Sequence, residues 1–169
     1  PIVVDVCGTN VPAVLVSTVN TPNPLTCEGT RTYNYTYTDC SGLVSNWKYT
    51  YTIDDSNAPT ATVPANITNL QCKTDIPIAK TSDLTNVTDN CLGTVNITVA
   101  DTNNGASGCK GNPYIVTRTY TLTDCAGNTT TLVQTITVED NTAPVLVGVP
   151  ANITAECDAV PSVAPVTNI

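Results

Sequence analysis

An internal repeat constrains this chain more than any other feature of its sequence. The string Tyr-Thr-Tyr-Thr-Asp-Cys at residues 35–40 returns as Tyr-Thr-Leu-Thr-Asp-Cys at residues 120–125, a shift of 85 positions. Val-Pro-Ala-Asn-Ile-Thr at residues 63–68 returns unchanged at residues 149–154. Repeats of this length form small modules that follow one another along the chain, so a single large core is not expected.

The cysteines follow the same period, because Cys72 and Cys157 are also 85 positions apart. The period divides the chain into three parts: the C-terminal part of one module at 1–58, a complete module at 59–143 and the N-terminal part of the next at 144–169. Joined tail to head, the chain continues its own period, since Asp5 then falls on the position of Asp89. Two interpretations follow. The chain is one two-module period of a long tandem fibre, or its length matches two periods by accident.

Alternation of apolar and polar residues predicts β-strands in both copies. In the first copy, tyrosines alternate with Asn and Thr at 33–37, and a partner run follows at 47–53. The second copy repeats the pattern at 118–122 and 132–138. Turn residues connect each pair of runs, so we expect hairpins. About seven short strands per period indicate an all-β fold of tandem immunoglobulin-like β-sandwich domains, with about two disulfides each.

Composition excludes several classes of function. The chain has no histidine, which removes the usual general base of Ser-His-Asp and Cys-His enzymes and most zinc sites. A formal net charge of -8, with only 6 Lys and Arg, provides no basic surface for nucleic acid. No apolar run reaches the ~20 residues of a membrane-spanning helix, so we expect no membrane insertion. The 8 cysteines indicate an oxidising compartment.

The cysteines of the expected sandwich fall at its two ends. Cys91 and Cys125 lie in loops at one end, and another pair lies near the opposite end. We therefore expect three bridges within modules, the third by repeat equivalence: Cys91–Cys125, Cys72–Cys109 and Cys7–Cys40. Cys27 and Cys157 are then left to pair with neighbouring repeats, Cys27 with the equivalent of Cys157 one unit upstream. Each bridge adds ~2–4 kcal/mol of stability.

Four strings of the second copy and its continuation resemble a known family. They are Arg-Thr-Tyr-Thr-Leu-Thr-Asp-Cys-Ala-Gly-Asn at 118–128, Gln-Thr-Ile-Thr-Val-Glu-Asp at 134–140, Ala-Pro at 143–144 and Pro-Ala-Asn-Ile-Thr-Ala-Glu-Cys at 150–157. In this order they are similar to HYR-like (hyalin-repeat-like) domains. Hyalin repeats proper tend to carry Cys before the Pro-x-Asn-Ile element, where this chain has Val, and this difference favours the bacterial branch.

The resemblance implies an immunoglobulin-like module of a very large surface adhesin, of the kind that gliding bacteria export through the type IX system. The expected location is therefore extracellular, on the bacterial cell surface. The expected function is a structural repeat of a fibre or adhesin stalk, giving length, stiffness and mechanical resilience for adhesion or gliding motility. The expected partners are neighbouring copies of the repeat and a surface or glycan ligand at a distal tip. The family supplies no catalytic residues, so we expect no enzyme.

Acidic residues gather where one module meets the next. The last strand of the first copy is followed by Asp54, Asp55 and Asn57, and the upper loops of the next module hold Asp89 and Asp124. Oxygen atoms of such side chains are the ligands that Ca²⁺ prefers, and the string resembles the calcium-binding linkers of cadherins. The candidate calcium ligands of the two junctions are Asp54, Asp55, Asn57, Asp89, Asp124, Glu139 and Asp140. The alternative is that these carboxylates cap turns and keep the surface charged.

The aromatic residues of the first copy allow a second hypothesis. The runs at 33–37 and 47–51 carry three tyrosines, then Trp47 and two more tyrosines, in alternating positions. Such residues favour a sandwich core, because the second copy replaces several of them with Leu, Ile and Gln. The alternative is a sugar-stacking face, which predicts a glycan-binding ancillary module of a secreted enzyme.

Overall fold

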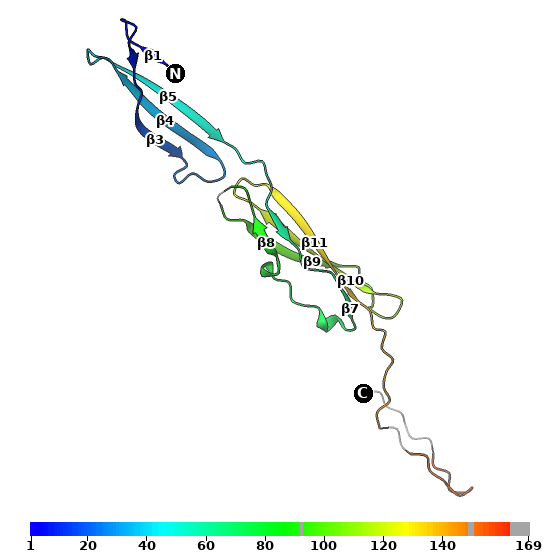
Figure 1. Cartoon of the computed structure of the whole chain (residues 1–169). Coiled ribbons are helices and arrows are strands. Elements are labelled where there is room, and N and C mark those ends of the chain that lie inside the picture. The colour runs from blue at the N-terminus through cyan, green and yellow to red at the C-terminus, as the bar shows by residue number, and fades with distance from the viewer. Residues whose placement is uncertain (92, 149–150, 163–169) are drawn as a thin grey trace.

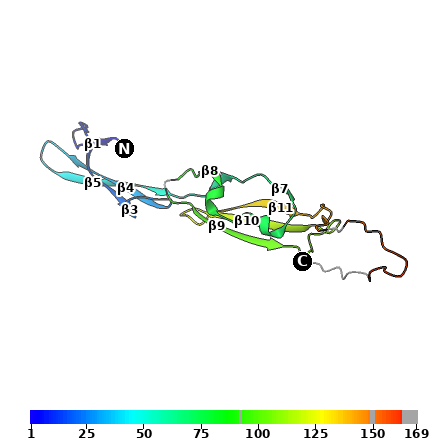
Figure 2. The ribbon, with the colours of Figure 1, turned by 90° about the horizontal axis from the view of Figure 1, so that it is seen from below.

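Two β-rich modules follow one another along the chain (Figure 1). The computed structural model describes residues 1–91, 93–148 and 151–162. The first module contains β1 to β5 and the second contains β6 to β11, and both views show the modules end to end (Figures 1 and 2). The strands are β1 (Val3–Val4), β2 (Asn10–Val11), β3 (Val14–Thr21), β4 (Gly29–Thr38), β5 (Val44–Ile53), β6 (Thr60–Thr62), β7 (Ile67–Leu70), β8 (Thr85–Thr88), β9 (Asn96–Asn103), β10 (Tyr114–Thr123) and β11 (Thr129–Val138). Two 3-10 turns, η1 (Lys73–Asp75) and η2 (Thr81–Asp83), precede β8.

The second module is a two-layer sandwich. Its larger sheet has the order β7-β11-β10-β9, and its smaller sheet pairs β6 with β8. The hairpin of β10 and β11 runs in unbroken antiparallel register from the Tyr114–Val138 pair to the Thr123–Thr129 pair. At the edge of the larger sheet, β7 joins β11 in parallel, with Ile67 opposite Ile136. The alternation of apolar and Thr residues thus points one face of the hairpin into the module.

The core of the second module lies between this hairpin and the segment 59–84. Tyr120 and Leu122 are fully buried, and they pack with Leu84 in one apolar cluster. The same buried face carries two polar side chains, which bind backbone carbonyls of the covering segment. Gln134 Nε2 donates to Ala65 O at 2.7 Å, and Arg118 Nη2 donates to Pro77 O at 2.6 Å. Segment 59–84 is therefore fixed to the sheet by both apolar contacts and hydrogen bonds.

The first module has the equivalent sheet without the equivalent cover. Its strands have the order β3-β4-β5, and only the short β1–β2 pair accompanies them. Trp47, Tyr49 and Tyr51 on β5 are 37%, 45% and 53% exposed. The expectation that these aromatic residues fill a sandwich core is therefore wrong in this structure, because no described segment of the first module lies where 59–84 lies in the second. Only Tyr37 of this face is buried.

The predicted all-β fold of tandem immunoglobulin-like modules is confirmed. The expected number of disulfides is wrong, because the described residues contain one bridge rather than about two per module. Among these residues, no helix is long and apolar enough to cross a membrane.

Candidate metal and disulfide site at the module junction

A disulfide joins the two modules. Cys27 lies in the loop between β3 and β4 of the first module, and Cys125 lies in the turn between β10 and β11 of the second. Their Cα atoms are 5.8 Å apart, although the residues are 98 positions apart in sequence. Cys27 is almost completely buried. The bridge thus fixes the end of the first module that carries the β3–β4 loop to the end of the second module that carries the β10–β11 turn.

Two glycines allow the backbone to approach this bridge closely. A Cβ atom at Gly29 would collide with the Thr21 carbonyl oxygen, so glycine lets the ends of the Cys27 loop close together, at a φ of +145°. A Cβ atom at Gly93 would collide with Cys125 Sγ and would lie 3.3 Å from Cys27 Sγ. Glycine is therefore required where the loop between β8 and β9 passes the disulfide.

Hydrogen bonds from the second module hold the linker that follows β5. Asp55 in this linker is 4% exposed. Asn128 Nδ2 donates to the Asp55 backbone oxygen at 2.9 Å and to Asp124 Oδ2 at 3.0 Å, so it connects the linker with the β10–β11 turn. Asn90 Nδ2 donates to Asp55 Oδ1 at 3.2 Å. The junction is therefore a packed interface with specific polar contacts.

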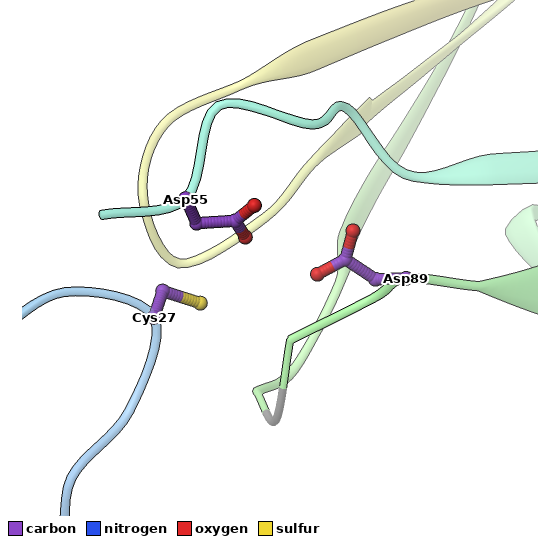
Figure 3. Close-up of side chains that lie close together, drawn as sticks. All are labelled: Cys27, Asp55 and Asp89. Carbon is purple, nitrogen blue, oxygen red and sulfur yellow. The ribbon is translucent and has the colours of Figure 1, made fainter. Parts of the chain in front are cut away.

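Two carboxylates face one another beside the disulfide (Figure 3). A carboxylate oxygen of Asp55, one of Asp89 and Cys27 Sγ all lie within 4.8 Å of one another. Asp55 Oδ2 and Asp89 Oδ1 are buried and have no hydrogen-bond partner. The ion pair within the described part of the chain joins Arg118 to Asp101, away from this site. The site therefore holds two acidic groups without a basic side chain to balance them.

The electrostatics of the neighbouring groups agree with this concentration of negative charge. A hydrogen bond to Asp55, together with burial and the charges of Asp55, Asp89 and Asp124, raises the pKa of the Cys91 thiol above its usual value. Burial opposes ionisation of Asp124, but hydrogen bonds from the Asn128 side chain and from backbone N–H groups of the turn outweigh it and lower the pKa of Asp124. Asp124 is thus a fixed anion of the turn.

The structure brings together only part of the candidate calcium set. A carboxylate oxygen of Asp55 and one of Asp89 lie within 4.8 Å of each other, and Asn128 connects Asp124 to the backbone oxygen of Asp55. The others lie elsewhere or play another part: Asp54 is exposed, Asn57 donates its backbone N–H to Asp55 Oδ1 at 3.1 Å, Glu139 Oε1 accepts from Gly111 N at 2.6 Å, and Asp140 Oδ1 accepts from Thr142 N at 2.9 Å. The last two lie at the far end of the second module.

The predicted disulfides require correction. The bridge expected between Cys91 and Cys125 is not formed, because the β3–β4 loop of the first module delivers Cys27 to Cys125 instead. Cys27 does pair with a neighbouring repeat, but downstream and not with the equivalent of Cys157. The six described cysteines without a disulfide are Cys7, Cys40, Cys72, Cys91, Cys109 and Cys157, so Cys72–Cys109 and Cys7–Cys40 are not formed either.

The segments of Cys72 and Cys109 nevertheless lie close together, as the sequence predicted. Lys73 Nζ donates to Ala106 O at 3.1 Å. Sequence reasoning assigned Cys27 to the junction with the upstream repeat and missed Asn128 at this one. The sequence contained one signal for this position of Cys27. Cys27 precedes β4 as Cys109 precedes β10, so Cys27 lies at the end of its module that faces the next module.

Comparison with known proteins agrees with this architecture. HYR-like domains with 4 cysteines match the chain at residues 1–53 and 59–138, which is most of both modules. No curated protein matches the chain. HYR-like domains are non-catalytic repeat modules and are typically extracellular. With two matching segments that follow the observed modules, the chain belongs to the family of HYR-like domains with 4 cysteines.

Proposed function

We propose that the chain is a structural repeat of an extracellular fibre or adhesin stalk on a bacterial surface, and that its partners are neighbouring copies of the same repeat. In this function the junction between modules is the important feature, because it determines the length and stiffness of the rod. A distal tip would carry the ligand that the fibre presents for adhesion or gliding.

One observation supports this proposal above the others, the disulfide between Cys27 and Cys125. A linker between independent domains is normally flexible and makes few contacts. Here a covalent bond and the hydrogen bonds to Asp55 restrict the motion of one module relative to the next. A chain that acts as a spacer needs this restriction, whereas a module that only binds a ligand does not.

Small-angle X-ray scattering tests the stiffness. The oxidised chain is expected to give a narrow distribution of interatomic distances with a well-defined maximum dimension. Cys27→Ser or added reductant is expected to broaden this distribution. Cys109→Ser is the matched control, because Cys109 is exposed and has no disulfide. An oxidised chain as flexible as Cys27→Ser would contradict the proposal.

Antibodies raised against the chain should also label surface filaments in electron micrographs, and label found only on released protein would contradict the fibre.

A second function has one observation in its favour, the exposed aromatic face of the first module. Trp47 and Tyr49 are stacked with their ring centroids 5.7 Å apart, and a shallow groove runs beside Tyr33, Tyr35 and Tyr51. Such faces bind sugar rings, so the chain would serve as a glycan-binding ancillary module of a secreted enzyme. Saturable binding of an oligosaccharide that Trp47→Ala abolishes would establish it.

A further inference from the structure

The two unpartnered carboxylate oxygens at the junction are suited to a positive partner. Burial of a charged group without a partner is strongly unfavourable, and two like charges at this distance raise the free energy further. Asp55 Oδ1 accepts hydrogen bonds from Asn57 N and Asn90 Nδ2, and Oδ2 has no hydrogen-bond partner. The Asp55 carboxylate as a whole extends toward that of Asp89 (Figure 3). Asp89 Oδ2 accepts from Cys91 N at 3.3 Å, and its Oδ1 has no partner.

We propose that Ca²⁺ binds between Asp55 Oδ2 and Asp89 Oδ1 and connects the two modules. The chemistry of the donors selects a hard cation, because the ligands are carboxylate oxygens and the nearby Cys27 sulfur is already bonded in the disulfide. Water molecules complete the coordination shell. Because Asp55 belongs to the linker and Asp89 to the second module, each bound ion stabilises the junction and not one module alone.

The test is thermal unfolding of the whole chain in CaCl₂ and in EGTA, with isothermal titration of CaCl₂ as a second readout. Saturating calcium is expected to raise the Tm by about 5 °C. Asp55→Asn and Asp89→Asn are expected to remove this increase, and in EGTA each is expected to unfold no lower than the parent chain, because the substitution removes repulsion. Asp140→Asn, the repeat equivalent at the far end of the second module, is expected to keep the full increase.

The outcomes separate clearly. A parent chain with no titration heat and no calcium-dependent Tm would overturn the site, and so would an increase that persists in Asp89→Asn. Neither result bears on the proposed function as a fibre repeat, since the disulfide and the scattering experiment that tests it do not depend on the ion.

Discussion

Replacing Cys27 with Ser is the most direct perturbation of the junction. The bridge closes a loop of 98 positions between the modules. In the chain-entropy treatment of disulfides, closing a loop of this length removes enough freedom from the unfolded chain to stabilise the fold by about 4.7 kcal/mol. With a denaturant dependence of about 2 kcal/mol per molar urea, the loss lowers the unfolding midpoint by about 2 M.

Urea unfolding followed by circular dichroism measures this shift, and thiol titration in denaturant measures the connectivity. The parent chain is expected to show six reactive thiols among its 8 cysteines. Cys27→Ser is expected to show seven, because Cys125 is released, whereas Cys109→Ser is expected to show five and to keep the parent midpoint. A parent midpoint in Cys27→Ser, or fewer than seven thiols, would refute the assignment of the bridge and the energy derived from it.

Three further predictions concern the second module and the disulfide. Leu122→Ala removes a fully buried side chain and is expected to lower the free energy of unfolding by about 2–5 kcal/mol, whereas Leu15→Ala at an exposed position should change it little; urea unfolding compares the two. Asp124 has a lowered pKa in the fold, so its contribution to stability is complete above about pH 4 and is lost as the pH falls through the folded value; Asp124→Asn is expected to flatten the acid side of the stability profile. Gly93→Ala is expected to expose eight thiols, because the new methyl group occupies the space of Cys125 Sγ.

The hairpins of both modules were predictable from sequence because their information is local. Alternation over ten residues with a turn between the strands predicts β10 and β11 directly, and the structure shows them in unbroken register. The repeat then transfers the same prediction to β4 and β5. Burial was less predictable, since it depends on which segment lies over the sheet. Tyr49 and its equivalent Gln134 occupy the same strand position, yet only Gln134 is covered.

The site was predictable in composition and not in connectivity. The linker carboxylate Asp55 and the loop carboxylate Asp89 were identified because strand ends and upper loops must meet at a junction. The partner of Cys125 was not identified, because the choice between Cys91 and Cys27 depends on the path of one loop outside the second module. Sequence spacing places cysteines at the ends of a sandwich, but only the relative placement of two modules decides which sulfur atoms meet.

The bridge between Cys27 and Cys125 also determines which part of the chain bears a load. When the two ends are pulled apart, tension passes through the two sulfur atoms, and residues 28–124 are bypassed. Fully extended, those residues span roughly 330 Å, and this length stays hidden while the bond is intact. A chain under traction therefore yields only outside residues 27–125 in oxidising surroundings. Reduction would release the hidden length and change an inextensible tether into one that absorbs a pull by unravelling.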